Sequence, residues 1–160
     1  MLIRGALGVG KTTVGKRLAQ RLSGEHVEVE GLLDALGVNE LVDGRIPVES
    51  FQRAYDCAMP RALETLAAGG VVIFEGCFYQ REVIDHLVGG LPYPHHAFTL
   101  KAPVEVCIQR DSGRERSFGE RAAREVHELV ARFDHGVGID ASGSAEEAVE
   151  HILSLLPVEG

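Results

Sequence analysis

Apolar runs and helix-like patterns alternate along the whole chain. Val14, Leu18 and Leu22 recur every four residues, which predicts an amphipathic helix over 12–22. Residues 71–74 form an unbroken apolar run instead, typical of a strand buried on both faces. By the same criteria we expect strands at 1–4, 27–30, 71–74, 97–100 and 137–139, and helices at 12–22, 32–36, 49–68, 81–88, 104–111, 120–134 and 144–156.

The alternation of strands and helices predicts the fold class. Five strands separated by helices indicate an α/β fold in which a parallel sheet has helices on both faces, a three-layer α/β/α sandwich. Ser144 and Glu147 match a capping box that would begin the last helix. Pro60 is expected to break or kink the helix at 49–68. The length of 160 residues fits one domain spanning 1–160.

Composition and charge narrow the class of protein. The net charge of −8 makes nucleic acid an unlikely partner, because nucleic-acid-binding proteins usually carry basic surfaces. No apolar run approaches the roughly 18 residues that span a membrane, so no membrane partner is expected. Three cysteines, with no CxxC pair among them, are typical of reduced thiols, and we expect a cytoplasmic protein.

The glycine-rich segment IRGALGVGKTT, residues 3–13, carries the strongest chemical signal. Gly5, Gly10, Lys11 and Thr12 match the full phosphate-loop pattern, placed between a predicted strand and a predicted helix. Such a loop holds phosphate oxygens with backbone N–H groups, while its lysine reaches the terminal phosphates and its threonine binds Mg²⁺. The expected nucleotide-binding residues of this phosphate loop are Gly5, Gly8, Val9, Gly10, Lys11, Thr12 and Thr13.

Two classes of phosphate-loop protein are disfavoured. A GTP switch needs an Asn-Lys-x-Asp motif, yet the only asparagine is Asn39 and Glu40 follows it. The segment 140–143 matches a switch-type DxxG, but it lies after the last strand, in the wrong order. A motor or transporter ATPase would usually need a longer chain.

Four further segments could carry chemistry, and three of them contain the end of a predicted strand, where ligands bind in open α/β sheets. HVEVEG (26–31) would place Glu28 and Glu30 on one face of a strand. VVIFEGCFYQRE (71–82) ends an apolar strand in Glu75, the usual place of a carboxylate that meets Mg²⁺. CIQRDSGRERSFGERAAREVH (107–127) contains five of the 16 basic residues, and IDASGS (139–144) follows the last strand.

With the phosphate loop, these segments resemble the P-loop small-molecule and nucleotide kinases, such as shikimate kinase, gluconate kinase, chloramphenicol phosphotransferase and, more distantly, adenylate kinase. The resemblance implies a strand order of 2-3-1-4-5 and transfer of the γ-phosphoryl group of ATP to a hydroxyl of a small molecule. It implies that Glu30 accepts the hydroxyl proton and that Thr12 and Glu75 hold Mg²⁺. Which of Glu28, Glu30 and Glu75 is the base and which meets the metal stays open.

The resemblance also assigns the basic segment and the last loop. It implies a short arginine-rich lid at about 111–119, with Arg110 and Arg114 against the transferred phosphoryl group and Arg116 as third choice. Asp140, Ala141 and Ser142 would contact the adenine base. The acceptor pocket would come from residues 31–60 and the stretch after Glu75, with the aromatic candidates Phe51, Tyr55, Phe78 and Tyr79.

Several alternatives remain open at this point. A nucleoside monophosphate kinase would need extra arginines near its acceptor, and Arg45, Arg53 and Arg61 are available. A polynucleotide 5′-hydroxyl kinase is disfavoured by the acidic balance. Another alternative, from outside the kinases, is a nucleotide-binding regulatory module that hydrolyses ATP slowly. ATP against GTP, and monomer against homodimer, are undecided.

Overall fold

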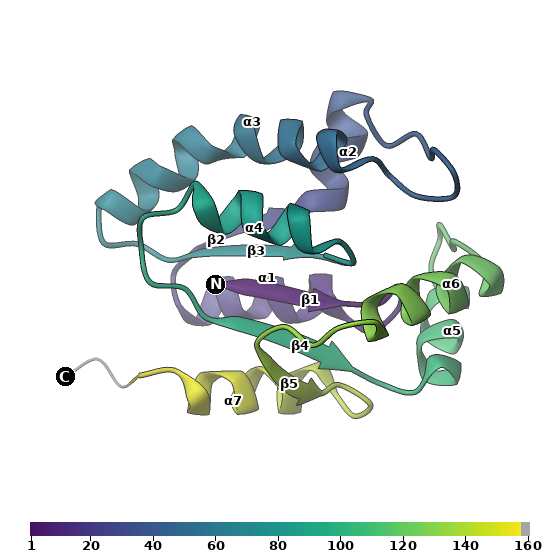
Figure 1. Ribbon diagram of the computed structural model, residues 1–160. Coiled ribbons are helices and arrows are strands. Elements are labelled where there is room, and N and C mark those ends of the chain that lie inside the picture. Colours follow the sequence, from purple (N-terminus) through teal and green to yellow (C-terminus); the bar gives the residue numbers. More distant parts are fainter. Residues whose placement is uncertain (158–160) are drawn as a thin grey trace.

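A five-stranded parallel sheet forms the centre of the computed structural model, which describes residues 1–157 (Figure 1). The strands are β1 (Leu2–Gly5), β2 (Glu25–Glu28), β3 (Val72–Gly76), β4 (Ala97–Lys101) and β5 (Val137–Asp140). They lie in the order β2-β3-β1-β4-β5, and each neighbouring pair is parallel. The fold class and the strand order expected from the sequence are therefore confirmed.

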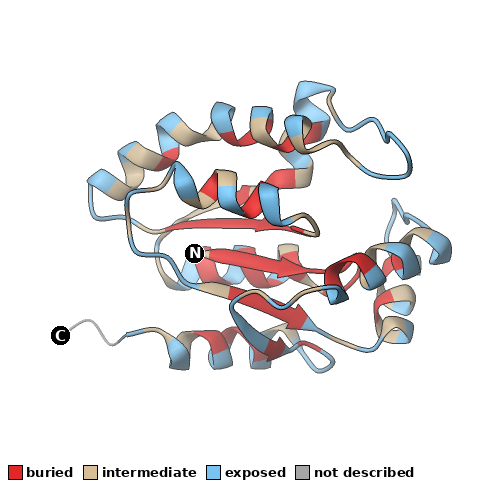
Figure 2. Cartoon of the chain, viewed as in Figure 1, coloured by how far each residue is buried: buried red, intermediate tan, exposed pale blue. Residues whose placement is uncertain are grey.

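Two hydrophobic clusters, one on each face of the sheet, hold the three layers together. Leu2 and Phe74 point to one face, whereas Ile3 and Ile73, their neighbours along the strands, point to the other. The first cluster packs on α2 (Val29–Leu36), α3 (Val48–Ala67) and α4 (Arg81–Gly89). The second packs on α1 (Lys11–Arg21) and α7 (Ala145–Leu155). Figure 2 shows β1 and β3 buried along their length between these layers.

The prediction of the second strand at 27–30 is wrong at its end, as the bounds of β2 show. β2 stops at Glu28, and Val29 already begins α2, so Glu30 lies in the first turn of a helix. Val29 and Leu33 are four residues apart and both fully buried, a spacing that a helix places on one face. The strand face expected to carry both Glu28 and Glu30 therefore does not exist.

Other boundaries also differ from the prediction. The expected break at Pro60 is absent, because α3 continues through the proline. Pro60 and Asp56, whose carbonyl loses its helical donor there, are both exposed, so water can take the place of the missing bond. β3 runs two residues further than expected and includes Glu75 and Gly76. α6 (Glu120–Ala131) ends three residues before the predicted end.

All five strands finish at the same edge of the sheet. Figure 1 shows the strand arrows pointing to the same side, with α5 (Val104–Ser112), α6 and the connection between α2 and α3 at that end. The phosphate-loop segment lies there too, between β1 and α1. Among residues 1–157, no helix is long and apolar enough to cross a membrane.

The turn into β5 offers a test of the fold. Gly136 has φ +70°, and a Cβ added to it would lie 2.1 Å from the carbonyl oxygen of Ala97 in β4. Gly37, at the end of α2, has φ +64° with no atom near the added Cβ. We expect Gly37→Ala to lower the free energy of unfolding by about 1 kcal/mol through backbone strain alone. Gly136→Ala should lower the free energy of unfolding by clearly more, because the added Cβ would force the start of β5 away from β4.

Urea unfolding of both variants, followed by circular dichroism, measures the difference. Equal losses in the two variants would mean that the close contact between the turn and β4 is absent in solution.

Candidate active site

The phosphate loop is packed tightly against α5. Gly8 has φ +76°, and a Cβ on it would lie 2.1 Å from the carbonyl oxygen of Cys107. Only glycine fits this position, because its left-handed conformation and the nearby backbone both exclude a side chain. Gly10, with φ +106°, precedes the first residue of α1. The first turn of α1 therefore begins directly at the loop, with its free N–H groups and positive end toward it.

Lys11 is the charged centre of the loop. Its side chain is buried, and Nζ donates a hydrogen bond of 3.0 Å to the carbonyl oxygen of Ala6. Burial works to lower the pKa of Lys11, but Cys77, Glu30 and Glu75 outweigh burial and raise it. Lys11 is thus a buried cation that faces two carboxylates, although neither lies within ion-pair distance in the described residues.

Glu30 is held at the end of β3 in spite of its unexpected place in a helix. Its Oε1 accepts a hydrogen bond of 2.9 Å from the backbone N–H of Cys77, the residue after β3. Its Oε2 lies close to Gly76, 3.4 Å from the point that a Cβ there would occupy. The first turn of α2 therefore delivers the carboxylate to the edge of the sheet beside the phosphate loop.

The Cys77 thiol lies between Glu30 and Lys11. Burial raises its pKa to about 12; Lys11 works in the opposite direction and Glu30 raises it further. A thiol with that pKa is neutral at physiological pH, so Cys77 is no nucleophile here. It separates the buried cation from the carboxylate with a small, uncharged group.

Glu75 is the other carboxylate near Lys11. Only 1% of the residue is exposed, and its Oε2 pairs with Nε2 of His26 at 3.2 Å. No second hydrogen bond to this carboxylate is found within residues 1–157. Thr12, half-buried in the first turn of α1, supplies a hydroxyl on the same side of the sheet.

Thr12 and Glu75 are the residues at this edge of the sheet that could hold a magnesium ion. Both are hard oxygen donors, as Mg²⁺ prefers, and a phosphate-bound Mg²⁺ needs few protein ligands because it keeps several waters. The described residues contain no cluster of three or more His, Cys, Asp or Glu that could hold a metal by itself.

Arg110 lies on the opposite side of the loop from Glu30. NH1 donates to the carbonyl oxygens of Val9 and Ala141, and NH2 donates to those of Ser142 and Gly143, at 2.7–3.2 Å. All four terminal N–H groups are therefore taken by backbone carbonyls. Arg110 ties the phosphate loop to the loop after β5, and its contact with a transferred phosphoryl group stays a prediction.

A cavity of about 180 Å³ lies beside Arg110. Thr13 and Gly10 line it from the phosphate-loop side, and Ala141 and Gly143 line it from the loop after β5. Asp140 caps that second loop, because its Oδ1 accepts hydrogen bonds from the backbone and hydroxyl of Ser142. The structure thus brings the two segments expected to bind nucleotide to one cavity.

The arginine-rich segment is a short loop tied to its own base. Oδ2 of Asp111, a buried residue in the last turn of α5, accepts hydrogen bonds from Ser117 Oγ and from the backbone N–H groups of Phe118 and Gly119. The first two residues of the predicted lid, 111 and 112, belong to α5. Arg114 is exposed and near enough to Lys11 to lower its pKa. Arg116 is exposed as well.

Three of the four aromatic residues expected at the acceptor pocket are core residues. Phe51, Tyr55 and Phe78 are at most 3% exposed, and Tyr55 stacks on Phe78. Tyr79 is partly exposed, and its hydroxyl accepts a hydrogen bond from the Ile46 backbone, which ties the loop after β3 to the connection between α2 and α3.

Arg4 is a buried cation that joins four parts of the fold. Its guanidinium donates to the carbonyl oxygens of Phe78 and Val130 and to Thr99 Oγ1, and it stacks 4.3 Å from the Phe133 ring. Burial is the largest influence on its pKa and lowers it. Phe78 has a positive φ of 47°, so Arg4 binds a strained point of the loop after β3.

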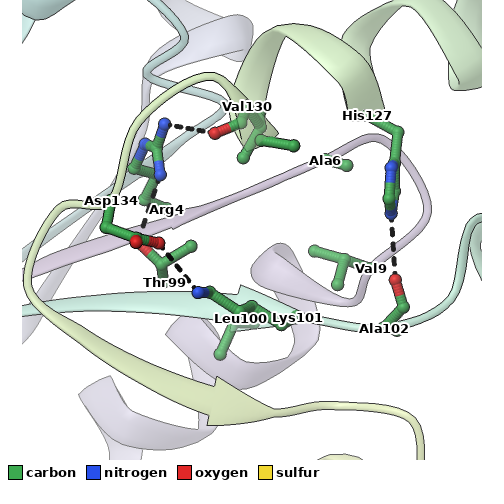
Figure 3. A pocket seen from close by; sticks show the side chains of 11 residues that line it. Arg4, Ala6, Val9, Thr99, Leu100, Lys101, Ala102, His127, Val130 and Asp134 are labelled. Atoms are coloured by element: carbon green, nitrogen blue, oxygen red, sulfur yellow. Dashed lines mark hydrogen bonds and ion pairs between the residues drawn. The ribbon is translucent and has the colours of Figure 1, made fainter.

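A second cavity, of about 190 Å³, lies between Arg4 and α6 (Figure 3). His127 lies across it and donates from Nε2 to the carbonyl oxygen of Ala102, while Lys101 pairs with Asp134 at its rim. Ala6 and Val9 of the phosphate-loop segment form its inner wall. It lies apart from the cavity beside Arg110, although Val9 borders both.

Sequence reasoning missed several residues around the site. The sequence did contain a signal for Arg4, because a charged residue inside an apolar strand must find polar partners when it is buried. Asp111 and Cys77 had none, because their partners are brought together only by the fold. The pairing of His26 with Glu75 also has no signal in the spacing, as the two residues are 49 positions apart.

Known proteins resemble the chain over most of its length. The family described as "AAA domain" matches residues 1–135. A protein of Thermococcus onnurineus (strain NA1) named "Putative adenylate kinase" is 27% identical over 163 residues, which cover 96% of this chain and 82% of that protein.

Two solved structures have the same fold. A gluconokinase from Sinorhizobium meliloti 1021 superposes with a TM-score of 0.71 at 18% identity, over 96% of this chain and 88% of the other. A sugar kinase from Janibacter sp. HTCC2649 gives a TM-score of 0.71 at 21% identity, over 96% and 91%. The chain therefore belongs to the AAA domain family and has the fold of the P-loop small-molecule kinases.

Proposed function

We propose that this protein is an ATP-dependent phosphotransferase that moves the γ-phosphoryl group of ATP to a hydroxyl of a small molecule. One observation carries the proposal. The carboxylate of Glu30 is fixed by the Cys77 backbone at the end of β3, beside the buried Lys11 of the phosphate loop. A base and a phosphate-binding cation at the same edge of the sheet are the two groups that such a transfer needs.

In phosphoryl transfer, the protein mainly positions the two substrates and neutralises charge on the phosphate oxygens. Lys11 would leave the Ala6 carbonyl for the oxygens of the terminal phosphates, a short movement for a flexible side chain. Arg114, exposed and near Lys11, would approach the same oxygens from the lid. Thr12 and Glu75 would hold Mg²⁺, which when bound neutralises charge on the phosphate oxygens.

Glu30 would bind the acceptor hydroxyl and accept its proton. The hydrogen bond to Oε1 leaves Oε2 as the oxygen that can receive the acceptor. Because the Cys77 thiol remains neutral, it cannot compete for that proton. This favours Glu30 as the base and Glu75 as the metal partner, since Glu75 is already paired with His26.

The nucleotide base would occupy the cavity beside Arg110. Ala141 lines that cavity, Ser142 follows it, and Arg110 binds the carbonyls of both and that of Val9. Asp140 would contribute through its hydrogen bonds to Ser142. In this proposal Arg110 is a positioning residue, and Arg114 is the arginine that contacts the phosphoryl group. The phosphate itself would be held by Gly5, Gly8, Val9, Gly10, Lys11, Thr12 and Thr13.

The proposal treats residues 1–160 as one catalytic domain with a lid at about 111–119. It takes the protein as cytoplasmic and as a monomer or homodimer. Its ligands are a nucleotide and a small-molecule acceptor.

A nucleoside monophosphate kinase is the second candidate, favoured by the name of the Thermococcus relative. It would need arginines that hold the acceptor phosphate. Arg61 pairs with Glu25 at 2.6 Å, and Glu25 begins β2, so Arg61 lies toward the edge of the sheet opposite the phosphate loop. This position argues against one of the three expected candidates. Arg45 remains in the connection between α2 and α3, at an isolated bridge with Val42.

Labelled ATP separates these candidates. Incubation with a panel of sugar acids, other hydroxyl metabolites and nucleoside monophosphates identifies the acceptor, and we expect transfer to a hydroxyl compound. Transfer only to nucleoside monophosphates would favour the second candidate. Release of ADP that no acceptor accelerates would favour a regulatory module with slow hydrolysis.

Glu30→Gln tests the base. The amide keeps the size of the side chain but cannot take a proton, so we expect kcat to fall about 10²–10⁴-fold with little change in ATP affinity. Lys11→Ala should abolish turnover and weaken nucleotide binding as well. Steady-state kinetics and calorimetry with ATP measure the two effects. Unchanged transfer in Glu30→Gln would remove Glu30 from the mechanism.

Arg114→Ala tests the lid. Loss of a cation that stabilises the transferred group should lower kcat about 10²–10³-fold. Arg121→Ala is the matched control, because Arg121 is an exposed arginine paired with Glu125 on α6. Its kinetics should equal those of the wild type. Equal rates in both variants would mean that the lid arginine takes no part in transfer.

A further inference from the structure

Within residues 1–157, His26 is the only hydrogen-bond partner of the buried carboxylate of Glu75. We propose that His26 is a positioning residue that holds Glu75 in place for a metal-bound nucleotide, and that Gly15 keeps the space which this pair needs. The inference rests on the proposed function, in which Glu75 is the metal partner. It concerns three elements that meet behind the phosphate loop: β2 with His26, β3 with Glu75 and α1 with Gly15.

The pair is buried and specific. The side chains of His26 and Glu75 are 14% and 2% exposed, and Nε2 lies 3.2 Å from Oε2. A carboxylate can only accept, so Nε2 donates. A buried carboxylate without this donor would be costly, because the desolvation of its charge would be uncompensated.

Glu75 has a competing partner in Lys11. The carboxylate acts on the pKa of Lys11 without forming an ion pair at 4.0 Å or less in residues 1–157. If Glu75 turned toward Lys11, the two charges would pair. The lysine would then be held away from a phosphate, and the carboxylate would no longer face the place proposed for the metal. The bond from His26 keeps Glu75 on the β2 side and so keeps the two charges apart.

Gly15 makes this geometry possible. A Cβ at Gly15 would lie 2.8 Å from His26 Nε2 and 3.5 Å from Glu75 Cγ, so any larger residue on α1 would displace the imidazole. The backbone of Gly15 is ordinary helix, and alanine there should stabilise α1 by about 1 kcal/mol in the absence of the pair. The contact with His26 and Glu75 therefore explains why a glycine suits position 15. An unusual backbone conformation does not explain it.

The test measures the contribution of Mg²⁺ to nucleotide binding, and not turnover alone. Calorimetry with ATP, in the presence of Mg²⁺ and in EDTA, gives the ratio of the two affinities. We expect His26→Ala to reduce this ratio about 10-fold or more, as is usual when a residue that orients a metal ligand is removed. Affinity for ATP in EDTA should change less than twofold. His26→Gln, whose amide can still donate, should restore part of the ratio.

Two further variants separate positioning from stability. Gly15→Ala should reduce the ratio without touching either charged group, and without lowering the midpoint of urea unfolding. His86→Ala is the matched control, because His86 pairs with Asp56 at 3.0 Å on the surface, away from the phosphate loop. Its ratio should equal that of the wild type. If His26→Ala does not fold, Gly15→Ala and His26→Gln decide the question.

The outcomes distinguish the inference from the function on which it rests. A wild-type protein that binds ATP no better with Mg²⁺ would overturn both. A wild type with a clear Mg²⁺ effect, and His26→Ala and Gly15→Ala variants with the same ratio, would overturn the positioning role alone. Reduced ratios in both variants, partial recovery in His26→Gln and no change in His86→Ala would support it.

Discussion

The close packing of α5 on the phosphate loop is the contact on which the rest of the site depends. The carbonyl of Cys107 lies so near Gly8 that no side chain fits between them, and three residues later Arg110 binds the carbonyls of Val9 and Ala141. One helix therefore sets both the shape of the phosphate loop and its distance from the loop after β5. Asp111, the next residue, ties down the arginine-rich segment, so the same turn of α5 also sets the position of that segment.

Within residues 1–157, Lys11 forms no ion pair with either carboxylate at the site. Lys11 faces Glu30 and Glu75, but each carboxylate has its own hydrogen-bond partner: the Cys77 backbone for Glu30 and the His26 imidazole for Glu75. A direct ion pair with either carboxylate would compete with a phosphate for Lys11. In the proposed function, the separate partners would leave the cation and both carboxylates available to a ligand. The hydrogen bond from His26 offsets part of the cost of burying Glu75.

Most of the fold could be predicted from the sequence, because periodicity in 12–22 and the apolar runs of the strands reflect burial directly. The strand order followed from resemblance, and the phosphate loop from a pattern whose every position has a physical reason. Glu30 is instructive: it was expected on a strand, yet it lies on a helix whose first turn brings it to the same edge of the sheet. The partners of Arg4, Cys77 and Asp111 could not be predicted, since each depends on segments distant in sequence.

One buried carboxylate accepts three hydrogen bonds that join the two ends of the loop from Asp111 to Gly119, and this restricts the freedom of the loop. In the proposed function, a ligand that contacts Arg114 would therefore lose less affinity to ordering that segment than it would with an untethered loop. In the proposed function, the acceptor pocket includes the connection between α2 and α3, where Leu41 and Val42 are more than half exposed. Selectivity among acceptors would then follow changes in that connection more closely than changes in the arginine-bearing loop.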